Sequence, residues 1–319
     1  MRISIGLELT NAKAMTRIIL VFFLIVHCLA LSAQELIPLW PKGKMPNSKG
    51  MKLTDSISNE RIHRVGTPGM YAFFTSREEN RGAAVLICPG GGYERLAYII
   101  SGTQIAKWFN TMGINAFVLN YRLPTSPDLK EREKGPLQDA QRALKIIYAN
   151  AGKWKLDTGK IGIWGCSAGG HLASLAGTAT GDISSNADSL DQYNYRPRFI
   201  LLVSPVIDLG DYAHKGSRKN LLGDTPSQDM IAAYSTQNRV TAVTPPTFLV
   251  HAFNDKSVDP QNSLLFYQAL MKQHISSSIH IFPQGGHAIA LRNNPGSAEY
   301  WTLLCEEWLK ETGILPAKK

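Results

Sequence analysis

The chain has 319 residues, of which 44% are hydrophobic, and it carries a formal net charge of +9. This length is sufficient for one large domain with a well-filled apolar core. The positive charges are scattered and form no basic stripe with interleaved aromatic residues, so we do not expect a nucleic-acid partner. The sequence also lacks the internal repeats and low-complexity tracts that mark solenoid or disordered proteins.

The first segment has the pattern of an export signal. Residues 18–31 are almost wholly apolar, Lys13 and Arg17 precede them, and small residues follow. This run is shorter than the roughly 20 residues that a membrane-spanning helix needs. We therefore expect residues 1–33 to be a signal peptide that starts at the first residue or at Met15. The mature protein is then periplasmic or secreted, with no stable membrane insertion; a retained membrane anchor is the alternative.

The chain beyond the signal alternates between apolar runs and amphipathic segments. Residues 34–81 are rich in turn residues and contain one candidate edge strand at 70–74. The other predicted strands are 83–88, 114–121, 160–164, 199–206, 247–252 and 278–282, and the predicted helices are 103–112, 137–151, 171–176, 263–273 and 298–309. Residues 211–240 break this alternation, so we expect them to form a short cap insertion over the active-site end.

Strands that alternate with helices predict an α/β fold. We expect a doubly wound, mostly parallel sheet with helices on both faces, all within a single domain that spans residues 34–319. In such sheets, reactive groups gather at the carboxyl ends of the strands.

The four cysteines show neither a disulfide framework nor a metal-binding spacing with histidine. Cys28 follows a histidine where a lipoprotein signal has a small residue, so no lipid anchor is expected. Cys88 and Cys166 each end a predicted strand, and we interpret both as buried free thiols. A disulfide between these two is the alternative. Cys305 falls on the apolar face of the last predicted helix.

A sharp turn is predicted where the strand 160–164 meets the helix 171–176. Residues 165–169 read Gly-Cys-Ser-Ala-Gly, the Gly-x-Ser-x-Gly pattern of a nucleophile elbow. Flanking glycines let neighbouring segments approach a serine that is held in strained backbone geometry. The helix that follows directs N–H groups and its positive dipole end toward a developing oxyanion. Ser167 is therefore the candidate nucleophile.

Three glycines follow the strand 83–88. Backbone N–H groups in such a loop can face a substrate oxygen, and with the N–H of Ala168 they would form an oxyanion hole. Two or three of the glycines at 90–92 are the candidates for this role. The alternative is an ordinary glycine-rich loop or a phosphate cradle, but no Lys-Ser/Thr pair follows, which excludes a Walker-type loop.

An acid and a base follow two later strands. Asp255 lies just beyond the strand 247–252, and a carboxylate there can hold the tautomer of a histidine and stabilise its imidazolium. Asp259 is the competing candidate. His287 follows the last predicted strand and lies beside two glycines, which suits a general base. The order Ser167, Asp255, His287 is the chain order of α/β hydrolases.

The remaining histidines carry weaker signals. His171 lies on the helix after the elbow and is expected to pack or to support the site. His251 and His280 lie in predicted strands, where core or edge roles are expected. No supporting sequence context surrounds His63, His214 or His274.

Several further segments carry a resemblance to a known family. They are residues 88–93 (CPGGGY), 120–124 (NYRLP), 139–143 (DAQRA) and 245–251 (PPTFLVH), together with the elbow. Over residues 36–309 the chain resembles α/β-hydrolase esterases related to bacterial acetyl-xylan and feruloyl esterases. The resemblance implies the α/β-hydrolase fold, a Ser167–His287–Asp255 triad, and an oxyanion hole at Gly91, Gly92 and Ala168.

The chain departs from the family's pattern beside the histidine. Residues 288–290 are Ala-Ile-Ala where relatives usually show a glycine and an aromatic residue, which would reshape the pocket wall. Pro89 stands where many lipases carry a histidine, a feature that relatives share. Tyr93, beside the glycines, either borders the acyl or sugar site or simply packs.

We predict an exported serine esterase that removes acetyl or small aromatic acyl groups from plant polysaccharides or oligosaccharides. It is expected to need no metal and no organic cofactor, and its partner is an ester substrate. One alternative is a serine peptidase of the prolyl-oligopeptidase type. Such peptidases carry a large N-terminal domain, whereas about 50 residues separate the predicted cleavage site from the oxyanion strand. The other alternative is a non-catalytic carbohydrate-binding protein on a hydrolase fold.

Overall fold

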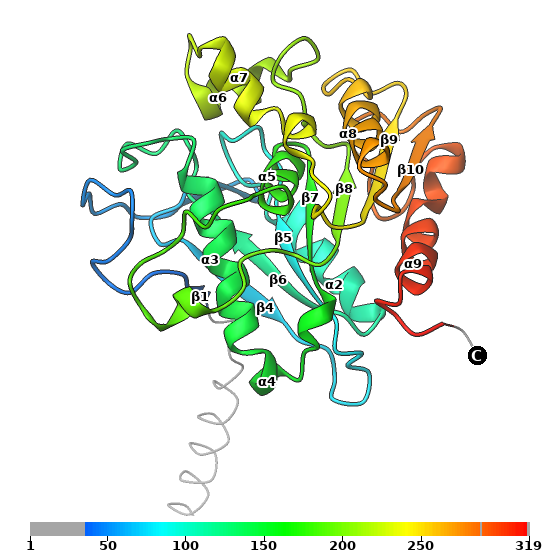
Figure 1. The fold of residues 1–319 in the computed structure, drawn as a ribbon, viewed down its shortest axis with the longest axis horizontal. Coiled ribbons are helices and arrows are strands. Elements are labelled where there is room, and N and C mark those ends of the chain that lie inside the picture. The colour runs from blue at the N-terminus through cyan, green and yellow to red at the C-terminus, as the bar shows by residue number, and fades with distance from the viewer. Residues whose placement is uncertain (1–35, 288, 318–319) are drawn as a thin grey trace, which may run out of the picture. The chain divides into compact units, whose positions relative to one another are not determined.

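The computed structural model describes residues 36–287 and 289–317, which form an α/β unit around one large sheet (Figure 1). The predicted signal peptide, with Cys28, lies outside the described residues. The sheet has eight strands in the order β1-β4-β6-β5-β7-β8-β9-β10. Their bounds are β1 Leu36–Pro38, β4 Gly69–Phe73, β5 Ala84–Cys88, β6 Asn115–Asn120, β7 Ile161–Cys166, β8 Ile200–Val203, β9 Thr247–Ala252 and β10 Ser278–Phe282.

The direction of the strands separates an antiparallel edge from a parallel centre. β1 pairs antiparallel with β4, and β4 pairs antiparallel with β6. Every other neighbouring pair of the sheet is parallel. The doubly wound, mostly parallel sheet expected from the sequence is therefore confirmed. A separate hairpin of β2 (Ser56–Ser58) and β3 (Arg61–Arg64) was not predicted.

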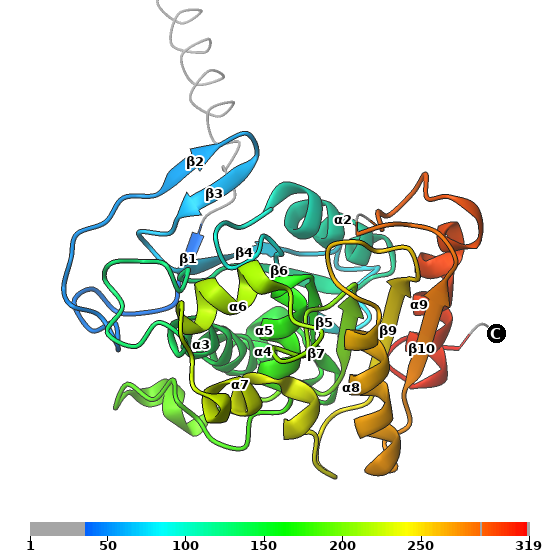
Figure 2. The same ribbon diagram turned by 90° about the horizontal axis from the view of Figure 1, so that it is seen from above.

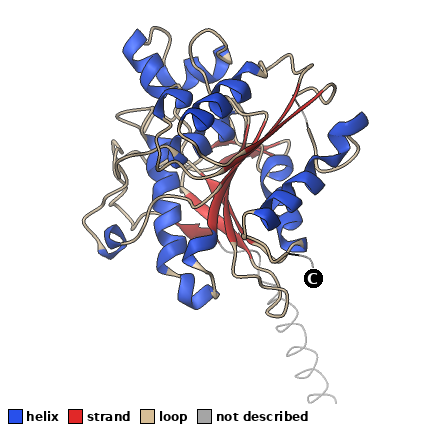
Figure 3. Ribbon diagram, turned by 45° about the vertical axis from the view of Figure 1, so that its right-hand side comes forward, coloured by secondary structure: helices blue, strands red, loops and turns tan. Residues whose placement is uncertain are grey.

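Helices cover both faces of the sheet, which Figure 3 shows nearly edge-on. The helices α3 (Gly135–Ala149), α5 (Ala168–Gly177) and α8 (Gln261–Lys272) lie on one face, and α2 (Gln104–Thr111) and α9 (Trp301–Glu311) lie on the other (Figure 2). Successive residues of β5 supply the two cores in turn. Leu86 packs in the cluster that contains α3 and α5, while Val85 and Ile87 pack in the cluster that contains α2 and α9. Burial on both faces explains the continuous apolar runs in the sequence.

Element bounds agree with the sequence where polar or turn residues flank an apolar run. β9 and β10 have the predicted bounds. β8 is shorter than the predicted 199–206, because Ser204 adopts a positive φ of 44° and a proline, which has no N–H to donate, follows it. The last helix begins at Trp301 rather than at 298, after a short 3₁₀ turn at Gly296–Tyr300.

A buried ion pair joins the end of β6 to α3. Arg122 donates to both carboxylate oxygens of Asp139, and neither side chain is more than 2% exposed. The indole N–H of Trp40 donates to the same carboxylate at 2.8 Å. These contacts give a structural reason for two of the segments that carried the family resemblance, 120–124 and 139–143. Removing one partner of such a pair leaves an uncompensated buried charge.

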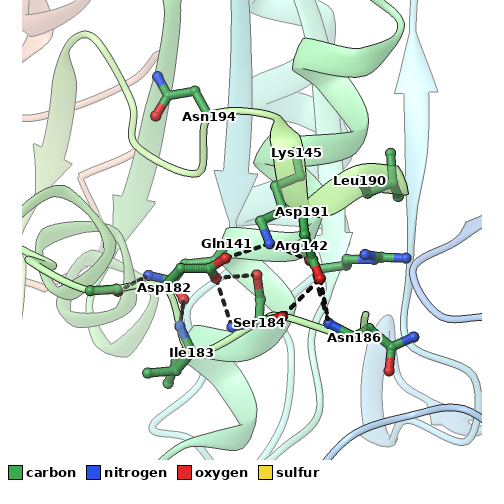
Figure 4. Close-up of polar contacts among 12 residues, drawn as sticks. Gln141, Arg142, Lys145, Asp182, Ile183, Ser184, Asn186, Leu190, Asp191 and Asn194 are labelled. Atoms are coloured by element: carbon green, nitrogen blue, oxygen red, sulfur yellow. Dashed lines mark hydrogen bonds and ion pairs between the residues drawn. The ribbon is translucent and has the colours of Figure 1, made fainter. Parts of the chain in front are cut away.

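A second polar cluster ties the loop after α5 to α3 (Figure 4). The ammonium of Lys145 is fully buried and pairs with the carboxylates of Asp182 and Asp191. Gln141 accepts from the backbone N–H of Ile183 at 2.9 Å. Arg142 pairs with Asp188 in the same loop. The loop between α5 and β8 is therefore fixed by side chains of one helix.

Residues 211–240 contain α6 (Lys215–Leu222) and α7 (Gln228–Tyr234), which lie beyond the ends of the parallel strands (Figure 1).

Cys88, Cys166 and Cys305 are free thiols, so the alternative Cys88–Cys166 disulfide is not formed. Among the described residues, no helix combines the length and apolar character needed to cross a membrane.

Candidate active site

Ser167 occupies the turn between β7 and α5. Its backbone has φ 55° and ψ −125°, a strained conformation for a residue with a side chain. The turn also requires close packing at Gly169, where a Cβ would lie 2.0 Å from the carbonyl oxygen of Cys88. The glycine after the serine thus lets α5 approach β5. The strand, turn and helix expected for a nucleophile elbow are all present.

His287 connects Ser167 to Asp255. The Nε2 atom of His287 lies 2.9 Å from the hydroxyl oxygen of Ser167, and its Nδ1 atom lies 2.7 Å from Oδ2 of Asp255. Asp259, the competing candidate, is exposed and accepts from the backbone N–H of Gln261 at the start of α8. The structure therefore brings Asp255, and not Asp259, to the histidine.

The carboxylate of Asp255 is buried and accepts several hydrogen bonds. Oδ1 accepts from the backbone N–H groups of Ser257 and Val258, at 2.8 and 3.0 Å. Burial alone raises the pKa of Asp255, but the hydrogen bonds from His251, His287 and the Val258 N–H outweigh it and hold the pKa well below its usual range. Asp255 is therefore an anion across the neutral pH range and can stabilise a protonated His287.

His251 is a partner of Asp255 that the sequence analysis left as a core residue. Its Nε2 lies 3.0 Å from the carbonyl oxygen of Val258, which can only accept, so Nε2 carries the proton. The same N–H faces Oδ2 of Asp255 at 3.2 Å, while Nδ1 lies 2.8 Å from the hydroxyl of Ser263. The sequence offers one signal for this role, since His251 is the penultimate residue of β9, the strand that precedes the acid.

The glycine loop after β5 presents free backbone donors. Gly91 and Gly92 line the cavity in front of Ser167, and within the described residues their N–H groups, like that of Ala168, have no hydrogen-bond acceptor. Gly91 has φ 135°, and a Cβ there would lie 2.1 Å from the carbonyl oxygen of Arg95. On the other side, Asn220 of α6 donates to the carbonyl oxygen of Gly92 at 2.9 Å. The segment 211–240 therefore contacts the loop that is the candidate oxyanion hole.

Tyr93 does not line this cavity, so of the two roles left open by the sequence, a substrate contact or packing, the structure favours packing. The side chain is fully buried, and its hydroxyl lies 2.8 Å from Nδ1 of His171. Nε2 of His171 lies 2.8 Å from the carbonyl oxygen of Tyr234, which fixes the proton on Nε2 and makes Nδ1 the acceptor. Tyr93 thus ties the glycine loop to α5, and His171 ties α5 to the end of α7.

The cavity that contains Ser167 has a volume of about 510 Å³. The residues that line it include Ser167, His287, Gly91, Gly92, Trp164, Cys166, Ile105, His214, Ile289, Ala290 and Leu291. Ile289 and Ala290, shortly after His287, therefore form part of the pocket wall. Burial, with a smaller contribution from Asp255, raises the pKa of Cys166 to about 12, so this thiol stays protonated and does not compete with the serine. The described residues hold no cluster of His, Cys, Asp or Glu suited to a metal ion.

Comparison with known proteins agrees with this architecture. The chain matches the family model described as BD-FAE over residues 73–270. It is 36% identical to the acetyl ester-xyloside bifunctional hydrolase from Caldicellulosiruptor lactoaceticus, whose structure superposes with a TM-score of 0.75 over 90% of this chain and 99% of that one.

Two curated relatives are longer proteins. The chain is 34% identical over 215 residues to the acetylxylan esterase of Xylanibacter ruminicola, which covers 66% of this chain and 42% of the relative. It is 32% identical over 227 residues to endo-1,4-beta-xylanase B of Butyrivibrio fibrisolvens, which covers 71% of this chain and 35% of the relative. The chain thus spans less than half the length of either one.

The sheet, the strand–turn–helix around Ser167 and the solved relative define an α/β-hydrolase fold and the class of carboxylic ester hydrolases. Within that class, the chain belongs to the BD-FAE family of α/β-hydrolase esterases.

Proposed function

We propose that the protein is an exported serine esterase that removes acetyl, or small aromatic acyl, groups from plant polysaccharides or oligosaccharides. The observation that carries the proposal is the continuous contact from Ser167 to His287 to Asp255, at 2.9 and 2.7 Å, on the wall of a cavity with free backbone N–H donors. Export is proposed from the basic and apolar pattern of residues 1–33.

The proposed mechanism is an acyl transfer in two steps. Nε2 of His287 takes the proton of the Ser167 hydroxyl as its oxygen attacks the ester carbonyl. The N–H groups of Gly91, Gly92 and Ala168 stabilise the resulting oxyanion. The protonated His287 then donates that proton to the leaving sugar oxygen. Water, activated by the same histidine, hydrolyses the acyl-enzyme and regenerates the serine.

Asp255 keeps the histidine in the tautomer that this cycle needs. Its Oδ2 accepts from Nδ1 of His287, so the lone pair of Nε2 faces the serine. Because the pKa of Asp255 lies well below its usual range, the carboxylate remains charged when the histidine becomes an imidazolium. No metal or organic cofactor takes part in this proposal.

The substrate class rests on the relatives and on the cavity. The names of the similar proteins, an acetylxylan esterase, a xylanase and an acetyl ester-xyloside hydrolase, point to acylated xylan. A cavity of about 510 Å³ is large enough for a short acyl group together with one sugar ring.

The test is the release of acetate from acetylated xylan by the mature chain, with Ser167→Ala as the matched variant. We expect wild type to release acetate and the variant to lose kcat by a factor on the order of 10⁶. An aminoacyl-proline nitroanilide, the peptidase substrate, should stay intact. Acetate release that persists in Ser167→Ala would contradict the mechanism. Cleavage of p-nitrophenyl acetate without any release from xylan would contradict the substrate.

A further inference from the structure

His214 is a titratable side chain in the cavity that the proposed mechanism does not use. It is the N-cap residue of α6, within the cap insertion, and it lines the cavity together with Ser167 and His287. The ring is half-buried. Its Cε1 atom would lie 3.9 Å from a Cβ placed on Gly92, so the imidazole lies beside the candidate oxyanion loop.

The hydrogen bonds that His214 makes as the N-cap residue of α6 determine which of its ring nitrogens carries the proton. Nδ1 accepts from the backbone N–H of Ser217 at 3.1 Å and lies 2.8 Å from the hydroxyl oxygen of the same residue. A backbone N–H can only donate, so the lone pair of Nδ1 is used and the proton of the neutral ring is on Nε2. Burial, and then the neighbouring His287, lower the pKa of His214, while Asp255 opposes them. The ring is therefore neutral at pH 7.

The proton on Nε2 of His214 has no acceptor among residues 36–287 and 289–317. Two contacts fix the ring relative to the site. The hydrogen bond from the backbone N–H of Ser217 to Nδ1 anchors the ring to α6, and Asn220 of the same helix donates to the carbonyl oxygen of Gly92. A half-buried N–H donor without a partner, held beside the reaction centre, is suited to bind an oxygen of the substrate.

We propose that His214 determines substrate specificity by donating its Nε2–H to a hydroxyl oxygen of the sugar next to the scissile ester. This inference rests on the proposed esterase function. An acetyl group offers one acceptor, its carbonyl oxygen, and the oxyanion hole takes that oxygen. The remaining acceptors belong to the alcohol side of the ester. A neutral donor matches an uncharged hydroxyl rather than a carboxylate.

The test compares two acetyl esters, p-nitrophenyl acetate, which has no hydroxyl beside the ester, and a mono-acetylated methyl xyloside. His214→Asn keeps a good N-cap for α6 but shortens the side chain. We expect the variant to cleave p-nitrophenyl acetate within about twofold of the wild-type kcat/KM. For the xyloside we expect kcat/KM to fall about tenfold, the loss of one hydrogen bond. The matched control is His274→Asn, at an exposed histidine with a φ of 56° that asparagine tolerates; it should change neither value.

A deoxy xyloside that lacks the neighbouring hydroxyl completes a double-mutant cycle. Wild type should lose about tenfold on this analogue, while His214→Asn should not distinguish it from the parent xyloside. An equal loss on both esters in His214→Asn would show a structural role, and unchanged kinetics on the xyloside would show that the donor is not used; either result overturns the inference. If wild type cleaves p-nitrophenyl acetate but not the xyloside, the proposed substrate is wrong and the inference falls with it. If wild type cleaves neither ester, the esterase proposal itself fails.

Discussion

The Asp255→Asn variant should separate the role of the acid from its contribution to folding. The asparagine oxygen can keep the two backbone N–H bonds that Oδ1 accepts, at 2.8 and 3.0 Å. Its NH₂ group then replaces Oδ2 and faces Nδ1 of His287 at the former 2.7 Å contact. A donor at this place requires Nδ1 to accept, which moves the proton of the neutral ring to Nε2. That nitrogen can then no longer take the proton of Ser167.

The expected cost in catalysis is about 10⁴-fold in kcat, which corresponds to about 5 kcal/mol of transition-state stabilisation. A second cost falls on folding. The new NH₂ group also faces the N–H of His251, which now lies 3.2 Å from Oδ2, so two donors oppose each other. One unsatisfied buried contact of this kind costs about 1–3 kcal/mol in the free energy of unfolding.

The assay is the initial rate on p-nitrophenyl acetate, with urea denaturation of the same sample to measure stability. Asp259→Asn is the matched control, because Asp259 is exposed and asparagine accepts the Gln261 N–H equally well. That control should keep kcat within about twofold. A near-wild-type kcat in Asp255→Asn, or a collapse of kcat in Asp259→Asn, would show that Asp255 does not set the tautomer of His287.

Three further outcomes are expected. His251→Leu removes one of the two side-chain donors to Asp255 and should lower kcat on p-nitrophenyl acetate about tenfold, with KM unchanged; an unchanged kcat would show that the donor is dispensable. Lys145→Met leaves buried carboxylates uncompensated and should cost about 3–5 kcal/mol in urea denaturation at pH 7. Burial alone raises the pKa of Asp191, but the hydrogen bonds from Lys145 and from other donors hold it well below its usual range, so this stability is present above about pH 4 and is lost as the pH falls. Between pH 6 and pH 3, the free energy of unfolding should therefore fall less in Lys145→Met than in wild type. An equal fall in the two proteins would contradict the role of Lys145. Tyr93→Phe should lower the melting temperature without changing KM for p-nitrophenyl acetate, because the hydroxyl forms its hydrogen bond inside the protein. A raised KM would instead show that Tyr93 contacts the substrate.

The sheet and the elbow could be predicted because their signals are local. β9 and β10 are apolar runs bounded by polar or turn residues, and both were predicted with the observed bounds. Ser167 lies in a pentapeptide whose two glycines let α5 pack closely, Gly165 against β7 and Gly169 against β5. The end of β8 could not be predicted, because the apolar run continues past Ser204, whose backbone has a positive φ.

The contacts that support the catalytic residues could not be predicted. Each joins segments that are distant in sequence, or joins a strand or helix to a loop. Tyr93 and His171 are 78 positions apart, so the sequence could not decide between packing and a substrate contact. His251 alternates with apolar neighbours inside β9 and has the pattern of a core residue until its partner on the next loop is known. His214 lies in a polar insertion with short helices, where hydrophobic periodicity gives no orientation.

Covalent labelling shows whether Ser167 is the nucleophile. The protein without residues 1–33, the proposed signal peptide, is treated with a fluorophosphonate, and the modified residue is located by peptide mass spectrometry. We expect one adduct, on Ser167, formed in step with the loss of activity on p-nitrophenyl acetate and formed far more slowly in a His287→Ala variant. No adduct on the active protein, or an adduct on another residue while Ser167 stays unmodified, would show that Ser167 is not the nucleophile.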